Sequence, residues 1–418
     1  MTTPDARGVQ PSPAIVFAAV GGLYVGQSVI GGFTFLGLPA VLRTAGLPLD
    51  KIGLLYLIVL PWALKFLWAP FIERFRLPRV GKNRSRIIVG AGVGTCAFGL
   101  VILAFAGPSP VIVAIAILFF IAVVTATVDI ACDGYAVEAL SKEQHGWANA
   151  AQVGGAYLGS AIGAGLFLVL VDLYGWTTAT LVMAALVVLL MLPFMCGPSA
   201  IARVETRNQT PSMRRALNRQ EIRNGLVIAA LYVAAQKWGL AMLGPFLIDY
   251  GFSLASLGLL NGAGSMIVGF AGALLGGMLV RLYGSRRVLL LSIIAQSLLL
   301  CAFALLALHR ETAHWIVMTL AITSSSGVMS IGFVALYACF MGWSDPRQAG
   351  VDFTLFQCMD GIVSMAGGIG AGTIAERFGY QTSFLIAAGI SALVAPILTL
   401  LLKRSDALAK AVKYSQTQ

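Results

Sequence analysis

The chain has 418 residues, of which 58% are hydrophobic and 11% charged, and its mean hydropathy is +0.88. Soluble domains carry about 25% charged residues, so this composition excludes a soluble globular protein and indicates an integral membrane protein. The net charge of +11 does not indicate a nucleic-acid partner, because the basic residues gather in alternate loops, as orientation in a membrane requires.

The predicted elements are membrane-spanning helices, for which about 20 apolar residues each are needed. The first 13 residues are polar, and the apolar run after them is too long for a signal peptide, so we expect an uncleaved first span. The expected spans lie at about 14–42, 50–72, 87–106, 111–139, 147–172, 177–197, 223–249, 255–281, 288–308, 315–341, 349–374 and 380–402. The sequence therefore predicts an all-α membrane protein of twelve transmembrane helices.

A polar connection divides six spans from six. We predict an N-terminal tail at 1–13, six-helix bundles at 14–197 and 223–402, a central loop at 198–222 and a C-terminal tail at 403–418. Lys and Arg gather in the central loop, in the loops after spans 2 and 8, and in the C-terminal tail. This bias places both termini and the central loop in the cytoplasm.

The two halves repeat weakly. AGLPLDKIGLL (45–55) aligns with YGFSLASLGLL (250–260), and LYGWTTA (173–179) aligns with RFGYQTS (377–383). The first pair is offset by 205 residues and the second by 204. Two six-span halves related by a parallel repeat are the architecture of the major facilitator fold.

Three carboxylates lie in or at the end of span 4. Asp129 and Asp133 are four residues apart and share one face of the helix, whereas Glu138 lies nearer the Arg-rich loop after span 2. An ionisable group inside the membrane is costly, and two close carboxylates titrate as a coupled pair. We expect proton coupling at Asp129 and Asp133, with a structural role as the alternative, and a structural ion pair at Glu138.

Two basic residues lie deep inside the predicted spans, away from the span ends. Lys65, in span 2, lies at about the depth of Asp133, so we expect a structural ion pair between them and no basic neighbour for Asp129. Lys237 lies near the middle of span 7 without an acid in its own helix, so a substrate anion or a carboxylate across the bundle is expected to meet it.

In the major facilitator architecture, spans 1, 4, 7 and 10 line the central cavity. We predict substrate contacts from polar and aromatic residues of these spans and from Asp360, a deep acid of span 11; they are Lys237, Gln236, Trp238, Tyr24, Gln27, Tyr337 and Asp360. Taken singly, each polar residue is also compatible with a hydrogen bond between helices. Asp352, nearer the end of span 11, is expected at the interface.

No enzymatic, metal or cofactor site is predicted. The six cysteines lie in apolar spans without a metal-ligand spacing, and the histidines lie in loops or at span ends. The glycine-rich stretches GAGVGTCAFG and GGIGAG do not stand between a strand and a soluble helix, so no nucleotide site is expected. A receptor would add a soluble output domain. Transport is therefore the expected function.

Several motifs resemble the AmpG-like branch of the major facilitator superfamily. They are KFLWAPFIERFRLPRVGKNRSR (65–86), the element Asp129-Ile-Ala-Cys-Asp133-Gly134, Lys237 and the stretch Thr354 to Gln357. Within that branch, DGYAVEAL is most similar to the RhtX/FptX-type siderophore permeases. The resemblance implies uptake of a siderophore or its iron complex, of the pyochelin kind, by alternating access across the bacterial inner membrane.

The chain departs from the muropeptide permeases of the same branch at one point. Those tend to read K-L-G-D from the span 7 lysine, whereas this chain has Lys237-Trp-Gly-Leu240, without the acid. We therefore expect siderophore import by a monomer in the lipid bilayer, without cofactor or nucleic acid. Import of muropeptides and export of a small amphipathic molecule remain the alternatives.

Overall fold

The computed structural model describes residues 13–44, 54–141, 144–196, 205–206, 209–252, 260–308 and 311–415. These residues are helical apart from turns and one pair of two-residue strands, β1 (Val80–Gly81) and β2 (Glu205–Thr206), which pair antiparallel with Val80 opposite Thr206. The predicted all-helical membrane fold is confirmed, and the small strand pair is an element that the sequence did not predict.

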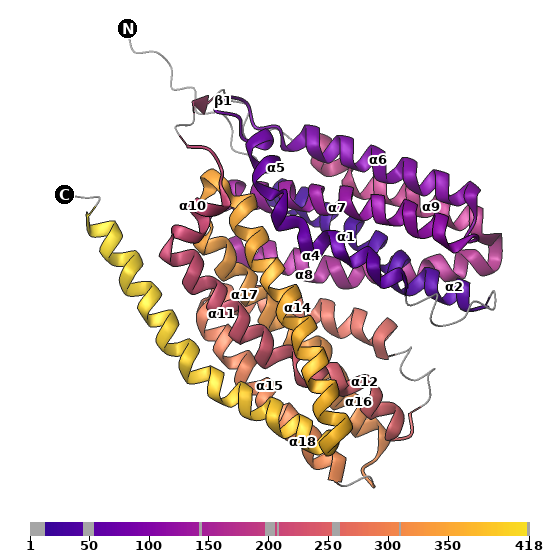
Figure 1. The fold of residues 1–418 in the computed structure, drawn as a ribbon, viewed down its shortest axis with the longest axis vertical. Coiled ribbons are helices and arrows are strands. Elements are labelled where there is room, and N and C mark those ends of the chain that lie inside the picture. The colour runs from indigo at the N-terminus through magenta and orange to yellow at the C-terminus, as the bar shows by residue number, and fades with distance from the viewer. Residues whose placement is uncertain are drawn as a thin grey trace. The chain divides into compact units, whose positions relative to one another are not determined.

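The chain forms two compact units (Figure 1). The first comprises Met1–Lys142, Ile162–Ser212 and Asp345–Val351, and the second Glu143–Ala161, Met213–Ser344 and Asp352–Gln418. Each unit therefore takes a short segment from the sequence range predicted for the other bundle. The predicted boundaries around 198–222 remain a prediction.

The first unit contains α1 (Pro13–Gly32), η1 (Phe33–Gly37), α2 (Leu38–Thr44), η2 (Leu54–Val59), α4 (Leu60–Leu64), η3 (Lys65–Leu67), α5 (Ala69–Arg76), α6 (Ser85–Ala106), α7 (Val111–Ala139), η5 (Ile162–Leu166), α9 (Phe167–Cys196) and η9 (Pro346–Gln348). Helix α9 packs against α1 and α6, and α6 also packs against α7. Phe33, Phe167 and Trp176 meet in the core, with ring centroids 4.6 to 5.9 Å apart.

The second unit contains α8 (His145–Ala161), α10 (Met213–Asn218), α11 (Gln220–Lys237), η6 (Gly239–Met242), α12 (Leu243–Asp249), η7 (Leu260–Gly264), α14 (Ser265–Tyr283), α15 (Ser285–Leu308), α16 (His314–Ile322), η8 (Thr323–Val328), α17 (Met329–Trp343) and most of α18 (Ala349–Ser415). Helix α14 packs against α8 and α17. Phe246, Phe303 and Phe384 lie at the centre of an apolar cluster, with ring centroids 5.2 to 6.3 Å apart.

Among the described residues, nine helical stretches are long and apolar enough to cross a membrane. Two of them, His145–Cys196 and Pro346–Leu402, are much longer than one crossing requires. The backbone leaves the helical conformation inside each, at Gly175 and Gly379, so each holds two of the predicted spans. The predicted second span is present as the short pieces η2, α4, η3 and α5 instead of one helix.

The two interruptions fall on the predicted repeat. Gly175 has φ 79° and ψ 170°, and Gly379 has φ 79° and ψ 167°. Both glycines are the third residue of the aligned segments 173–179 and 377–383. A weak sequence match therefore corresponds to the same sharp turn in both units. This φ/ψ region is essentially restricted to glycine.

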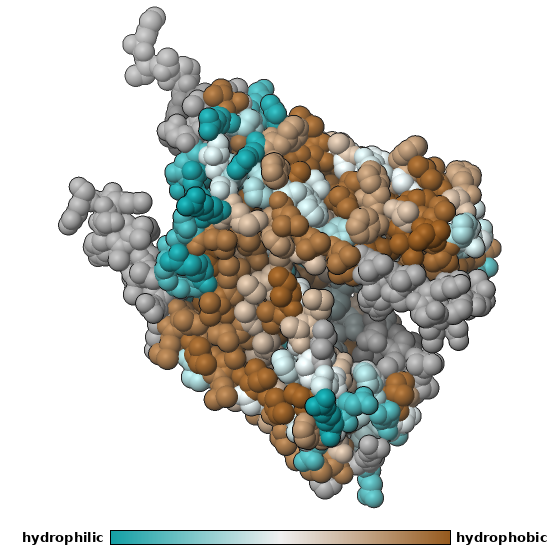
Figure 2. All heavy atoms as spheres, viewed as in Figure 1, coloured by the Kyte–Doolittle hydropathy of each residue, from teal (hydrophilic) through white to brown (hydrophobic). Residues whose placement is uncertain are grey.

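Large apolar side chains cover the outside of the helices. Figure 2 shows hydrophobic residues along the visible sides of the helices and hydrophilic residues toward their ends. Phe98, Phe105, Leu298, Met365 and Leu393 are among the exposed side chains. Contiguous apolar surface of this extent is what lipid-facing helices require.

A substitution pair tests the turn at Gly379. We expect Gly379→Ala to destabilise the protein by about 1–3 kcal/mol, because an L-residue is strained at this φ/ψ. Gly389→Ala is the matched control: it lies in the same helix, nothing lies within 4 Å of the added Cβ, and alanine favours the helix. Thermal unfolding in detergent measures both. Equal stability of the two variants would contradict the assignment of the turn.

Candidate functional site

The first buried charge in the membrane-spanning part lies where the second span breaks. Helix α4 passes into the 3₁₀ turn η3, with Leu64 at φ −102°, ψ 0° and Trp68 at φ −110°, ψ −4°, before α5 begins next to Pro70. Proline lacks an N–H donor and therefore favours such a helix start. The break holds the Lys65 side chain, of which 3% is exposed, in the interior of the first unit.

Helix α7 supplies the partners of this segment. Lys65 Nζ forms an ion pair with the Asp129 carboxylate, whose side chain is 10% exposed. Next to it, Trp68 Nε1 donates a hydrogen bond of 3.1 Å to Thr127 Oγ1. Both contacts hold the broken span against α7.

Asp133 lies one turn further along α7 and is fully buried. The Tyr24 hydroxyl of α1 donates a hydrogen bond of 2.6 Å to Asp133 Oδ1. Tyr24, Lys65, Asp129 and Asp133 together form what we call the acid site, which joins α1, the broken second span and α7. Gln27, one turn after Tyr24, has a buried side-chain nitrogen without a hydrogen-bond partner.

This geometry corrects one prediction. Asp129 was expected to lack a basic neighbour, and that expectation is wrong, because Lys65 pairs with it. The predicted depth of Lys65 came from a regular helix, whereas the backbone leaves the α-helical conformation between Leu64 and Trp68. The proton-coupling role of the two aspartates remains a prediction.

The second deep charge lies at another helix break. Lys237 is the last residue of α11, and the 3₁₀ turn η6 follows it. Its Nζ lies 2.6 Å from Asp360 Oδ1 of α18 and 4.7 Å from the centroid of the Phe333 ring of α17. The prediction that Lys237 would meet a carboxylate across the bundle is confirmed as a contact.

Two hydroxyl groups complete the surroundings of Asp360. Ser364 Oγ donates to Asp360 Oδ1 at 3.0 Å, and Tyr337 OH donates to Oδ2 at 3.5 Å. Lys237, Phe333, Tyr337, Asp360 and Ser364 form what we call the Lys237 site. The sequence predicted Lys237, Tyr337 and Asp360, but neither Ser364 nor Phe333.

Two predicted contacts lie elsewhere. Gln236 is fully buried and donates a hydrogen bond of 3.0 Å to Tyr232 OH, which in turn lies 2.7 Å from Ser292 Oγ. The Trp238 ring lies against α18 near Gly367 and Gly370. Consecutive residues of a helix do not share a face, so neither side chain accompanies that of Lys237.

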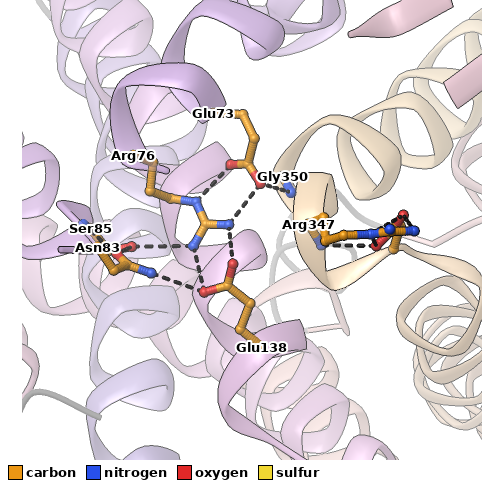
Figure 3. Close-up of polar contacts among 8 residues, drawn as sticks. Glu73, Arg76, Asn83, Ser85, Glu138, Arg347 and Gly350 are labelled. Carbon is orange, nitrogen blue, oxygen red and sulfur yellow. Dashed lines mark hydrogen bonds and ion pairs between the residues drawn. The ribbon is translucent and has the colours of Figure 1, made fainter. Parts of the chain in front are cut away.

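A buried network around Arg76 was not predicted (Figure 3). Arg76 donates to Glu73 at 2.6 and 2.7 Å and to Glu138 at 2.9 and 3.1 Å. Asn83 Nδ2 also donates to Glu138, and the backbone N–H of Gly350 donates to Glu73. We call these residues the arginine network. The expected ion pair of Glu138 with the loop after span 2 is present.

Local sequence explains how this network fits together. Glu73 and Arg76 are three residues apart and therefore share one face of α5, a spacing that by itself indicates an ion pair along the helix. Gly134 of α7 makes room for the guanidinium, since a Cβ there would lie 2.8 Å from Arg76 Cζ. The carboxylates of Glu73 and Glu138 together balance the charge of the buried guanidinium.

A further ion pair joins the start of α11 to α18. Arg219 pairs with Asp352 and also donates a hydrogen bond of 2.8 Å to the Trp343 carbonyl. Asp352 is fully buried in the first turn of α18. Its expected place at the membrane interface stays a prediction.

Comparison with known proteins identifies the family to which these features correspond. Residues 16–322 and 226–417 match the sequence profile of the Major Facilitator Superfamily. The anhydromuropeptide permease of Escherichia coli strain K12 is 25% identical over 367 residues, which cover 85% of this chain and 74% of that protein. An uncharacterized protein of Haemophilus influenzae is 26% identical over 367 residues, covering 83% of this chain and 85% of that one.

The fold is also similar to that of a solved transporter. The fucose:proton symporter FucP of E. coli superposes with a TM-score of 0.69 at 16% sequence identity, over 92% of this chain and 98% of the symporter. At this identity the similarity concerns the fold alone.

The Lys65–Asp129 pair leads to a testable asymmetry between the two aspartates. We expect Asp129→Asn to lower membrane levels and stability, by about 3–5 kcal/mol, because it leaves Lys65 buried beside a neutral group. Adding Lys65→Met should restore much of the loss. Asp133→Asn should cost less, because the amide oxygen still accepts from Tyr24. Membrane levels and thermal unfolding measure all variants, and a double variant no better than Asp129→Asn would contradict the pairing.

The arginine network allows a second comparison. We expect Arg76→Gln to destabilise the protein by about 3–5 kcal/mol, since Glu73 and Glu138 would remain buried without the guanidinium. Arg79→Gln, on the exposed surface of the same segment, should change stability by no more than about 0.5 kcal/mol. Thermal unfolding in detergent distinguishes them, and similar losses in both would refute a specific role for the network.

Proposed function

Because this chain belongs to the Major Facilitator Superfamily, a family of membrane transporters, we propose that it imports anhydromuropeptides, the sugar–peptide fragments of the cell wall, into the cytoplasm. The observation that carries the proposal is the similarity to the anhydromuropeptide permease of E. coli along 85% of this chain. The resemblance of the motifs around Lys65 and Asp129 to the AmpG-like branch supports the same assignment.

The partly exposed charges of the second unit are suited to such a ligand. Muropeptides carry free carboxylates on their peptide, and Lys237 is a deep cation with 30% of its side chain exposed. The Lys65 side chain is far less exposed, at 3%, whereas the two aspartates are similar, at 10% for Asp129 and 12% for Asp360. In this proposal Lys237 meets the ligand, whereas Lys65 holds the broken second span to α7.

The acid site is proposed to couple transport to protons. Asp129 is paired with Lys65, and Asp133 accepts a hydrogen bond from the Tyr24 hydroxyl. In this proposal the two aspartates together bind a proton on one side of the membrane and release it on the other during alternating access.

We propose a bacterial inner-membrane location with both termini in the cytoplasm. The Lys and Arg bias of the loops supports this orientation. Uptake from the periplasm by a monomer, as the sequence analysis expected, is part of the same proposal.

Siderophore import is the second candidate, and one observation favours it. Muropeptide permeases of the branch tend to carry an acid at the position of Leu240. In this chain the residue is apolar and packs against the cluster around Phe246 and Phe303. The neighbourhood of the Lys237 site is therefore less polar than the muropeptide pattern implies, which would suit a more aromatic anion.

Uptake assays separate the two candidates. In a bacterial host without its own muropeptide permease, the chain should import radiolabelled anhydromuropeptide at least about tenfold above the empty vector, and a proton uncoupler should abolish accumulation. Iron-55 complexed to pyochelin is the parallel substrate. Lys237→Gln should lose uptake while the exposed Lys82→Gln retains it. Uptake of the iron complex without uptake of the muropeptide would reject the first proposal in favour of the second.

A further inference from the structure

Asp360 has hydrogen-bond donors besides Lys237. The hydroxyl groups of Ser364 and Tyr337 donate to its two oxygens at 3.0 and 3.5 Å. A buried polar group that keeps hydrogen-bond partners avoids the cost of an unsatisfied one. If Lys237 moves away, Asp360 therefore keeps two donors.

Lys237 has a corresponding second contact. Its Nζ lies 4.7 Å from the centroid of the Phe333 ring, close enough for a cation–π interaction. Phe333 is itself held by edge contacts with Tyr232 and Tyr337, at centroid distances of 6.1 and 5.7 Å. The ring is thus positioned by its neighbours and does not depend on the ion pair.

The exposure of this pair also differs from that of the other buried ion pair within the predicted spans. The Lys237 and Asp360 side chains are 30% and 12% exposed, whereas those of Lys65 and Asp129 are 3% and 10% exposed. A purely structural pair gains from being closed off, because water weakens it. The Lys237 pair is instead accessible on the side of the cation.

We propose that Asp360 is an internal counter-ion, and that a carboxylate of the transported molecule replaces it on Lys237 during binding. The inference rests on the proposed function in so far as the transported molecule is an anion. Breaking an ion pair inside a membrane protein is costly when nothing replaces the lost partner. An exchange of one carboxylate for another leaves the cation paired, and Asp360 falls back on Ser364 and Tyr337.

The exchange makes Asp360 a specificity-determining residue. A neutral ligand cannot replace Asp360, because Lys237 would then lose a charge-assisted hydrogen bond, which is stronger than one between neutral groups. The site should therefore prefer a ligand with a free carboxylate over its neutral derivative by about tenfold or more.

Equilibrium binding to the purified full chain in lipid nanodiscs tests the proposal. The probes are two matched pairs: anhydromuropeptide tripeptide with its carboxyl groups free or amidated, and pyochelin as the free acid or methyl ester. Wild type should bind the acid of one pair about tenfold or more tightly than its neutral form. Lys237→Gln should reduce this ratio to about one, and Lys237→Arg, which keeps the charge, should retain most of it.

The Asp360 variants distinguish an exchanged counter-ion from a structural partner. Asp360→Asn removes the competing charge but can still accept from Ser364 and Tyr337, so it should bind the acid at least as tightly as wild type. The reversed pair, Lys237→Asp with Asp360→Lys, keeps an ion pair but should lose the tenfold preference for the acid over its neutral form. Loss of the acid preference in Asp360→Asn, or a wild-type ratio in Lys237→Gln or in the reversed pair, would overturn the proposal.

The two ligand pairs separate this inference from the proposed function. Carboxylate preference for pyochelin alone would reject muropeptide import and support the exchange at Lys237. Muropeptide binding without preference for the acid would support muropeptide import and reject the exchange at Lys237. Binding of neither acid would overturn both. Thermal unfolding of each variant, compared with wild type, shows that the changes in ratio come from folded protein.

Discussion

The cost of placing a charge in a hydrocarbon interior governs how this chain is arranged. Four basic residues described above, two of them buried and two partly exposed, each meet an acid: Lys65 meets Asp129, Arg76 meets Glu73 and Glu138, Arg219 meets Asp352, and Lys237 meets Asp360. The partners come from different helices in all cases but the Glu73–Arg76 pair, so the ion pairs join elements that are far apart in sequence. Removing one partner is expected to be far worse than removing both.

Both deep lysines lie where a helix is interrupted. Lys65 begins the 3₁₀ turn η3, and Lys237 ends α11 just before the 3₁₀ turn η6. Interrupted helices are common at the binding sites of membrane transporters, where irregular backbone is tolerated if it faces protein or a cavity. The two lysine sites differ in exposure, because the Lys65 side chain is buried and the Lys237 side chain is partly exposed. Because of this difference, we propose a structural role for the Lys65 pair and ligand exchange for the Lys237 pair.

The two units share one backbone turn but differ in the charged residues that they carry. The matching turns at Gly175 and Gly379 show that a repeat detected through a few residues extends to backbone conformation. Next to these turns, Trp176 packs in the core of the first unit and Tyr380 against Phe246 in the second. The charged sites do not repeat, since the first unit places two acids on α7 and the second brings Lys237 of α11 to Asp360 of α18. The two units therefore share a backbone turn but carry different charged residues.

The sequence by itself determined the class of protein, the number and approximate bounds of its spans, and the residues that carry charge inside the membrane. These features follow from composition and from the length of apolar runs, which depend only on local sequence. It also identified Lys237, Asp360, Tyr337, Asp129 and Asp133 as candidates, because any ionisable group at such depth requires an explanation.

Only the tertiary structure decided which charges meet. Lys65 meets Asp129 at a helix break that apolar periodicity does not reveal, and Arg219 reaches the buried Asp352 from 133 residues away in the sequence. The arginine network brings residue 350 next to Glu73, a separation of 277 residues that no local pattern spans. Pairing between helices is set by packing angles and helix breaks, and these are properties of the folded chain as a whole.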